Sequence, residues 1–266
     1  MILGNKIKPE RREPMMINSA LSDNFNHRFA VVTADTLALQ KQAYRLRYQV
    51  YCIENRFENT LDHPLEQEID EFDARSVHSV VIDRPSQTVT GTVRLILPNP
   101  TAIEKSFPIQ KVCSHPLLQS RKLLYTARSA EISRFAVSKE FSRMAAGPPT
   151  SRRHTDFSDE KQASVSNITL GLLNGVVRMS LEHGITEWFA VMEPTLLRLL
   201  ARFGIYFSPI GPMVDYHGMR QPCHAIIENL LDRARKERID VWKIVTDNGR
   251  LLDREDQQFA PFRLSN

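Results

Sequence analysis

The sequence predicts an α/β protein built as a sandwich around a mixed central sheet. Two observations support this class. Short β-rich runs alternate with segments of helical periodicity, in the order β-α-β-β and then β-α-β-α-β-β. The chain also has 266 residues, of which 42% are hydrophobic, and this is enough for one large domain with its own core.

The first half of the chain contains three expected strands and one expected helix. Leu37 and Val50 belong to a set of apolar residues at near-helical spacing, and Asp35 or Thr36 can cap the first turn of that helix. The expected boundaries are a strand at 29–33, a helix at 36–55, a long loop at 56–75, and strands at 77–82 and 88–97. Residues 83–87 carry a hairpin signal that joins the last two strands.

The second half begins with an expected strand at 130–137. The composition then changes at residues 139–163, which we expect to be a mobile insertion. The later expected elements are a helix at 164–183, a strand at 185–192, a helix at 195–203, strands at 206–210 and 222–227 around a turn at 216–220, and an amphipathic helix at 226–246. Together these patterns predict a flexible leader at 1–24, a single domain at 25–246 and a polar tail at 247–266.

Charge and cysteine content narrow the function classes. The net charge is +4 and basic residues are scattered among acidic ones, so nothing indicates nucleic-acid binding. The three cysteines, Cys52, Cys113 and Cys223, give no disulfide framework and no zinc-ligand spacing, which favours a reducing cytoplasm. No apolar run approaches the length of a membrane span. We therefore expect a cytoplasmic protein with no transmembrane segment and no metal.

The segment from Glu131 to Val137 places an acid, a hydroxyl and a guanidinium in an otherwise strand-like run. Strict alternation would put four of its residues on one face, namely Glu131, Ser133, Phe135 and Val137. A carboxylate on a half-buried face is costly unless it is paired or hydrogen-bonded. Glu131 is therefore either a buried ion-pair partner or a group whose pKa is shifted for chemistry, and the segment alone leaves both open.

Three upstream segments accompany this strand: Leu46-Arg47-Tyr48-Gln49-Val50-Tyr51 followed by Phe57, then Glu68-Ile69-Asp70-Glu71-Phe72-Asp73, then Gly91-Thr92-Val93-Arg94-Leu95-Ile96-Leu97-Pro98. In this order and spacing they resemble the acyl-homoserine-lactone synthases. They resemble more closely the N-acyl amino acid synthases and the exosortase (PEP-CTERM) system-associated acyltransferases. The resemblance covers residues 27–138 well and 165–228 more loosely. It implies the GNAT-like three-layer sandwich, whose central sheet splays between strands 131–137 and 185–192 to admit a pantetheine arm.

The resemblance also implies catalytic roles. Glu131 matches the glutamate of the synthases' strand motif and is our first choice for the base that takes a proton from the acceptor amine. Its alternative role is that of an ion-pair partner for Arg47 or Arg94. Ser133 and Arg134 of the same motif complete the expected catalytic group. Because no Ser-His-Asp or Cys-His arrangement is apparent, we expect direct acyl transfer without an acyl-enzyme.

The remaining motif residues are expected to bind or frame the substrates. Arg47, Asp70, Asp73, Arg94 and Arg134 match charged family positions whose implied role is a buried electrostatic cluster. Within it Arg94 needs a carboxylate partner, Asp70 or Asp73, because it lies in the middle of an apolar strand. Backbone N–H groups around Phe135 to Val137 are expected to stabilise the oxyanion. The expected substrate-binding residues are Arg47, Tyr51, Phe57, Asp70, Asp73, Arg94, Phe135 and Val137.

The expected acyl donor is a carrier protein. Gly171 and Gly175 do not have the spacing of the phosphate loop that holds a CoA pyrophosphate, so acyl carrier protein is favoured over CoA. The co-substrate would be an acyl-phosphopantetheine thioester, with no permanently bound cofactor. Eight basic residues could dock an acidic carrier, with ordinary solvated faces as the alternative for each: Arg152, Arg153, Arg198, Arg202, Arg233, Arg235, Lys236 and Arg238. An acyl tunnel could be lined by Leu172, Val176, Met179, Phe189 and Leu200, or these could simply be core.

The acceptor stays open, because Phe57 stands where the lactone synthases usually have Trp. Three hypotheses follow. The first is an N-acyltransferase that joins a fatty acyl group to an amino-acid-like amine, of the exosortase-associated type. The second is an acyl-homoserine-lactone synthase that uses S-adenosylmethionine. The third is a non-catalytic protein of the same fold that binds acyl chains or a partner.

Overall fold

A computed structural model describes residues 20–120, 128–139 and 154–253 of the chain. Its helices are α1 (Ala20–Arg28), α2 (Leu37–Arg47), α3 (Pro116–Gln119), α6 (His154–Glu182), α7 (Pro194–Arg202), α8 (Ile227–Glu237), α9 (Ile239–Val245) and α10 (Arg250–Asp253). Its strands are β1 (Phe29–Thr33), β2 (Ser76–Asp83), β3 (Thr88–Ile96), β4 (Ser129–Val137), β5 (Glu187–Met192), β6 (Ser208–Pro209), β7 (Val214–Asp215) and β8 (Met219–Ile226). A π-helical segment, Tyr48–Glu54, continues α2.

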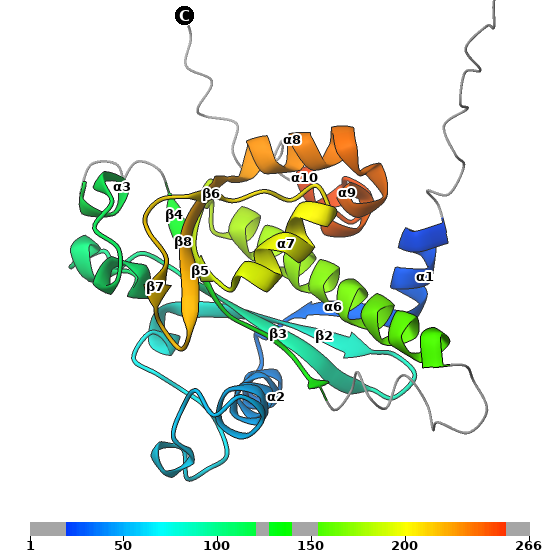
Figure 1. Cartoon of the computed structure of the whole chain (residues 1–266), viewed down its shortest axis with the longest axis horizontal. Helices are drawn as coiled ribbons and strands as arrows, with labels where there is room; N and C mark the ends of the chain where they lie inside the picture. Colours follow the sequence, from blue (N-terminus) through cyan, green and yellow to red (C-terminus); the bar gives the residue numbers. More distant parts are fainter. Residues whose placement is uncertain (1–19, 121–127, 140–153, 254–266) are drawn as a thin grey trace, which may run out of the picture.

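The described strands form a mixed sheet in the order β1-β2-β3-β4-β5-β8-β6, with β7 paired to β8. Every neighbouring pair is antiparallel except β4 and β5, which run parallel. A parallel pair needs a long crossover, and here the crossover contains α6. Figure 1 shows α6 running along the sheet on the side opposite to α2. The strand direction therefore changes from antiparallel to parallel between β4 and β5, in the middle of the sheet.

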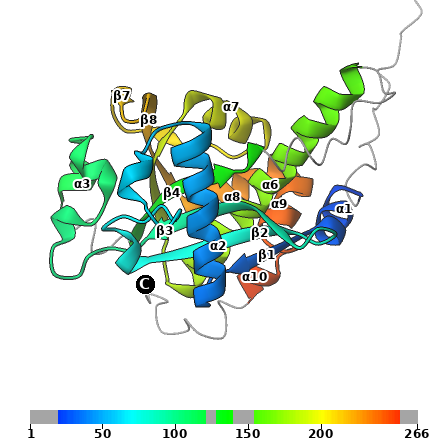
Figure 2. The same cartoon turned by 90° about the horizontal axis from the view of Figure 1, so that it is seen from below.

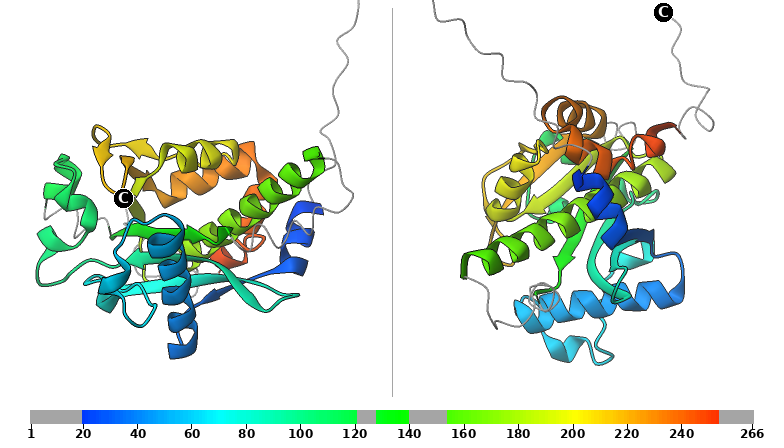
Figure 3. Two further views of the ribbon diagram at one scale, coloured as in Figure 1. Left: turned by 60° about the horizontal axis from the view of Figure 1, so that its bottom comes forward. Right: turned by 90° about the vertical axis from the view of Figure 1, so that its right-hand side faces the viewer.

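Helices cover both faces of the sheet. Helix α2 contacts β2, β3 and β4, and α6 contacts β1 to β4 from the other side. In Figure 2, α2 crosses in front of the strands, and Figure 3 shows α7 and α8 on the side of the sheet away from α2. The α/β sandwich and the mixed sheet predicted from the sequence are confirmed.

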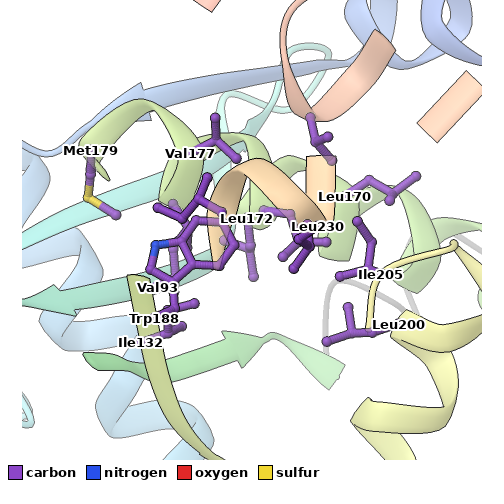
Figure 4. Packing of buried hydrophobic residues seen from close by; sticks show 14 of the residues in the cluster. Val93, Ile132, Leu170, Leu172, Val177, Met179, Trp188, Leu200, Ile205 and Leu230 are labelled. Carbon is purple, nitrogen blue, oxygen red and sulfur yellow. The ribbon is translucent and has the colours of Figure 1, made fainter. Parts of the chain in front are cut away.

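The main core lies between the sheet and α6. The indole of Trp188 on β5 is fully buried, and its Nε1–H donates to the Ser180 Oγ of α6 at 2.8 Å, so its polar atom is satisfied. Figure 4 shows this ring among side chains of α6 and the neighbouring strands, including Leu172 and Val177. Residues on β5 are apolar in succession because the strand is covered on both faces.

Glycines allow α6 to approach the sheet closely. A Cβ at Gly175 would lie 2.6 Å from the Cβ of Ser79 on β2, and a Cβ at Gly91 on β3 would lie 2.6 Å from the Cγ2 of Ile168. Both distances are shorter than any normal carbon contact, so a side chain there forces a shift of packed elements. Gly175, whose spacing did not fit a phosphate loop, thus serves helix–sheet packing.

We expect Gly175→Ala to lower the free energy of unfolding by about 1–3 kcal/mol through this overlap, measured by urea denaturation. The higher helix propensity of alanine acts in the opposite direction by about 1 kcal/mol, so a net loss identifies the steric term. The double variant Gly175→Ala with Ser79→Gly should recover part of the loss. A single variant as stable as the wild type would contradict this packing.

Several predicted boundaries need correction. Helix α6 begins at His154, inside the predicted mobile insertion 139–163, and α1 begins at Ala20, inside the predicted leader 1–24. The polar tail predicted from residue 247 contains α10, whose Leu251 is buried against the main core. The predicted helix 226–246 is divided at Arg238, whose φ of −144° leaves the helical region. Residues 1–19, 140–153 and 254–266 lie outside the described part, so the expectations for them stay predictions.

No helix among the described residues is long and apolar enough to cross a membrane.

Candidate functional site

The central sheet splits between β4 and β5. These strands pair only from Ser129 to Ile132, opposite Glu187 to Ala190. Strand β4 continues to Val137 with β3 as its neighbour, whereas its other edge has no strand partner beyond Ile132 in the part of the chain that the structure describes. The splay expected between segments 131–137 and 185–192 is therefore confirmed, and it exposes backbone hydrogen-bonding groups along one side of β4.

A β-bulge interrupts β4 at the point where the split begins. Thr92 pairs with Ala136 and Arg94 with Ser133, so β4 has one more residue than β3 in this interval. Arg134 adopts a φ of +48°, which only a local distortion of the strand explains. The bulge allows two successive side chains, Ser133 and Arg134, to reach the same side of the sheet.

The bulge also overturns the predicted alternation of faces. Arg134 contacts Glu68 on the α2 side, and Ala136 packs with Leu46 there. Phe135 and Val137 pack instead against the main core on the α6 side. The prediction that Phe135 and Val137 share a face with Glu131 was wrong, because strict alternation cannot anticipate an inserted residue.

A cavity of about 430 Å³ occupies the split. Much of its wall is apolar and comes from β4, β5, α6 and α7: Ile132, Phe135, Val137, Val165, Leu173, Val191, Met192, Leu196, Leu199 and Leu200. Of the five residues predicted to line a tunnel, Leu200 does so. Leu172, Val176, Met179 and Phe189 are buried in the core instead.

A second, smaller pocket of about 40 Å³ adjoins this cavity. Glu131, Arg94, Tyr216 and His217 are on its wall. Six residues line both spaces: Tyr51, Ile132, Ser133, Arg134, Val191 and Arg220. The large cavity and the small pocket therefore meet around the bulge of β4.

Glu131 is buried at this junction, with only 2% of its surface exposed. Its Oε2 accepts a hydrogen bond from the Ile109 N–H at 2.9 Å. Burial raises the pKa of Glu131 to about 7, although the Ile109 bond acts in the opposite direction. Among the described residues no ion pair joins Glu131 to Arg47 or Arg94, whose carboxylate partners lie elsewhere.

Three arginines and three acids form a closed ring beside the pocket, which we call the charge ring. Its members, in the order of their contacts, are Arg47, Glu68, Arg134, Asp70, Arg94 and Asp73. Arg47 binds Asp73 with two hydrogen bonds of 2.6 and 2.9 Å, and Arg94 binds Asp70 with two of 2.6 and 3.0 Å. These paired bonds fix the direction of each guanidinium. The expected pairing of Arg94 with Asp70 or Asp73 is confirmed.

The charges in the ring balance one another. Burial alone would raise the pKa of Glu68, but Arg47 and Arg134 lower it to about 2. Asp73 is likewise buried, yet its bonds to Arg47 hold its pKa below the usual range. Burial, together with Arg47, lowers the pKa of the adjacent His78 to about 4, so this imidazole is neutral at pH 7. Glu68 and Asp73 are thus ionised at neutral pH.

The ring connects to the pocket through β4 and the π-helical segment. Arg94 donates from Nε to the Ser133 Oγ at 2.9 Å, which leaves the Ser133 hydroxyl hydrogen available to another acceptor. The Arg134 guanidinium lies 5.1 Å from the ring centroid of Tyr51. Tyr51 in turn packs near Phe57, with ring centroids 6.2 Å apart.

The predicted site residues therefore divide into three groups. Glu131, Ser133, Arg134, Arg94 and Tyr51 line the small pocket. Phe57, Phe135 and Val137 line the large cavity. Arg47, Asp70 and Asp73 line neither space and lie in the charge ring, so their contact with substrate stays a prediction.

Several neighbours of the pocket were not predicted as site residues. Glu68 opens the motif 68–73, and the clustering of acids there was its signal. Glu58 contacts both Arg134 and His217, and nothing in the sequence marked it. Arg220 is the last residue of the predicted turn at 216–220 and had no signal beyond that position.

Comparisons with known proteins agree with this geometry. The acetyltransferase (GNAT) domain family matches residues 46–147. An acyl-homoserine-lactone synthase of Aliivibrio fischeri is 26% identical over 183 residues, which span 67% of this chain and 81% of that protein. The structure of TofI in a ternary complex with an inhibitor and MTA has a TM-score of 0.54 at 18% identity, covering 78% of this chain and 96% of TofI. FeeM, an N-acyl amino acid synthase from uncultured soil microbes, has a TM-score of 0.50 at 14% identity, covering 77% and 94%.

The fold is therefore the GNAT-like sandwich that the sequence predicted, with the site at the split of its sheet. The domain match and the curated relative are both acyltransferases, and they place this chain in the acyltransferase class.

Proposed function

We propose that this acyltransferase moves a fatty acyl group from the thioester of an acyl carrier protein to the amine of an amino-acid-like acceptor. The observation that carries the proposal is the junction of two spaces at one strand. The large cavity has the apolar wall that an acyl chain requires. The small pocket has the buried carboxylate of Glu131, which can take a proton from the acceptor amine. Both meet at the bulge of β4.

In the proposed reaction the acceptor amine loses a proton to Glu131, directly or through a water. Its nitrogen lone pair then forms a bond to the thioester carbonyl carbon, and the carbonyl oxygen becomes an oxyanion. Backbone N–H groups on the unpaired edge of β4, together with the Ser133 hydroxyl, are suited to stabilise that charge. Collapse breaks the carbon–sulfur bond, and the released pantetheine thiolate takes up the second proton, which the nitrogen loses as the amide forms. Glu131 then gives the first proton to solvent.

The state of the cysteines supports direct transfer. Burial raises the pKa of the Cys52 thiol to about 11 and that of Cys223 to about 12. Neither residue lines the two spaces, and neither does Cys113. A thiol that stays protonated and lies away from the cavity is a poor nucleophile, so the amine itself is the proposed attacking group.

A carrier protein is the proposed donor because the two glycines of α6 pack against the sheet rather than forming a phosphate loop. Exposed arginines on α7 and α8, including Arg198, Arg202 and Arg235, are available to an acidic partner. Arg233 and Arg238 are less available, since Arg233 pairs with Glu237 and Arg238 pairs with Asp240 and donates to the Arg202 carbonyl. Arg152 and Arg153 lie outside the described residues. Such a donor fits the expected cytoplasmic location.

A lactone synthase remains the second candidate, and the specific observation in its favour is the curated relative from Aliivibrio fischeri. In that case the acceptor would be S-adenosylmethionine, and methylthioadenosine would be released. The exosortase-associated type is favoured by the Tyr216-His217-Gly218 turn, which resembles a turn of that group. Phe57 stands where the lactone synthases usually have Trp, which counts against S-adenosylmethionine as the acceptor. Both candidates use the same donor space and differ in the acceptor.

The deciding experiment incubates the purified protein with long-chain acyl carrier protein thioesters and a panel of amines. The panel contains the proteinogenic L-amino acids and S-adenosylmethionine. We expect thiol release that depends on one acceptor, and an N-acyl product of matching mass by mass spectrometry. Acyl-homoserine lactone with methylthioadenosine would select the second candidate. Absence of any N-acyl product across the panel would refute both.

We expect the rate to rise with pH through the pKa of Glu131. The base must be ionised to accept a proton, and its pKa is about 7. The value of kcat/KM should therefore rise about tenfold between pH 6 and pH 8 and then flatten. Deprotonation of the acceptor's ammonium group also raises the rate with pH, so the residual activity of Glu131→Gln is the control. An inflection near pH 7 that persists in that variant would contradict the assignment.

A further inference from the structure

The small pocket has three arginines on its wall, and they differ in how fully they are already bound. Arg94 and Arg134 each donate to carboxylates of the charge ring. Arg220, on β8, has weaker partners: its Nη2 lies 3.2 Å from the Oε1 of the exposed Glu193 and 3.3 Å from the His217 carbonyl oxygen. Arg220 is therefore the guanidinium of this pocket with capacity for a further anion.

The geometry of Arg220 strengthens this point. Its Nε is buried and has no hydrogen-bond partner among the described residues, and no described residue accepts from its Nη1. An unsatisfied buried N–H of a charged group is costly, so a ligand that accepts from it gains that energy on binding. The guanidinium lies 5.4 Å from the ring centroid of Phe57, which limits how far it can turn.

The size of the pocket restricts the ligand. Its volume of about 40 Å³ admits only a few non-hydrogen atoms, yet its wall contains both Glu131 and Arg220. A compact group that carries an amine and an anion on one carbon can use the carboxylate and the guanidinium together. An α-amino acid head has this arrangement, whereas a simple amine lacks the anion.

We propose that Arg220 is the residue that recognises the α-carboxylate of the acceptor and so restricts the enzyme to α-amino acids. The inference rests on the proposed function and adds the substrate class and the residue that selects it. It applies equally to an amino acid and to the methionine moiety of S-adenosylmethionine. Arg220 also lines the large cavity, so the phosphate of the donor's pantetheine arm is a second source of the same oxyanion chemistry.

The test compares wild type with Arg220→Ala on three substrates: the accepted amino acid, the corresponding amine that lacks the carboxylate, and the acyl carrier protein thioester. We expect the KM of the amino acid to rise roughly tenfold to a hundredfold. The kinetics with the carboxylate-free amine and the KM of the thioester should change little. Arg250→Ala, which removes an exposed arginine on α10, is the matched control and should leave all values unchanged.

Binding can also be measured without turnover, by titration calorimetry with the full chain. The amino acid should bind wild type and should not bind Arg220→Ala at the same concentration. An unfolding midpoint of the variant equal to that of wild type shows that the variant is folded. If Arg220→Ala is misfolded, Arg220→Lys is used in its place. Lysine keeps the positive charge but lacks the planar guanidinium, so this variant should show a KM for the amino acid between those of wild type and a complete loss. Equal losses with the amino acid and its carboxylate-free amine would overturn the inference, as would a rise confined to the KM of the thioester. Failure of the wild type to acylate any amine would instead refute the proposed function.

Discussion

Glu131→Gln is expected to lower N-acyl transfer by about 10²–10⁴-fold while the protein stays folded. The amide has nearly the shape of the carboxylate and its oxygen can still accept the Ile109 N–H bond, but it cannot take a proton from an ammonium group. The measurement is the rate of thiol release from acyl carrier protein at pH 8 with saturating acceptor. A variant with more than a tenth of wild-type activity would show that Glu131 is not the base.

The stability of Glu131→Gln relative to wild type should depend on pH, and this separates a change in folding from a change in catalysis. The native pKa of Glu131, about 7, lies above its ordinary value of 4.5, so the folded state binds a proton more tightly than the unfolded chain. The stability that this contributes is fully present below pH 4.5 and is lost as the pH rises through 7. Glutamine has no such loss. Relative to wild type, Glu131→Gln should therefore be more stable at pH 8 than at pH 5, measured by thermal unfolding at both values.

Arg47→Met is expected to lower the free energy of unfolding by about 3–5 kcal/mol, since it removes one member of a buried ion cluster. Arg47 is completely buried and holds Glu68 and Asp73 together. Without it, two buried carboxylates lose a partner that offsets their desolvation. The measurement is urea denaturation at pH 7, monitored by tryptophan fluorescence.

The control for this prediction is an ion pair on the surface. Lys111 contacts Glu71 at 2.8 Å, but both side chains are more than 60% exposed. Lys111→Ala should cost less than about 1 kcal/mol because solvent already screens the pair. The cost of Arg47→Met should also shrink at low pH, since native-state stabilisation of Glu68 is present above pH 4.5 and lost as the pH falls towards its native pKa of about 2. Equal losses in the two variants would contradict a structural role for the charge ring.

Regular elements of the fold could be predicted from the sequence because their patterns are local. The hairpin of β2 and β3 followed from two apolar runs around a turn, and Thr36 caps α2 by accepting from the Leu39 N–H. The start of α6 could not be predicted, because its first turns are polar and read as a loop. The division between α8 and α9 at Arg238 was missed because both segments continue one apolar periodicity.

The site was predictable only in part, for a physical reason. The charged residues of the motifs do converge, and Glu131 does lie at the split of the sheet. The bulge at Arg134 could not be foreseen, since it depends on the register with β3. Glu131 accepts a hydrogen bond from Ile109, and Arg220 forms part of the wall of the small pocket. Both residues come from segments that are distant from Glu131 in the sequence. Long-range contacts of this kind leave no local pattern.

The central claim is that the space between β4 and β5 holds the fatty thioester next to Glu131. The most direct test is a crystal structure with a non-hydrolysable acyl-pantetheine amide that has a long saturated chain. The account predicts that the chain lies in the apolar cavity between α6, α7 and the split strands, with its carbonyl beside the bulge of β4. An acyl chain bound elsewhere would contradict the claim. So would strands β4 and β5 that pair along their whole length and leave no space for the chain between them.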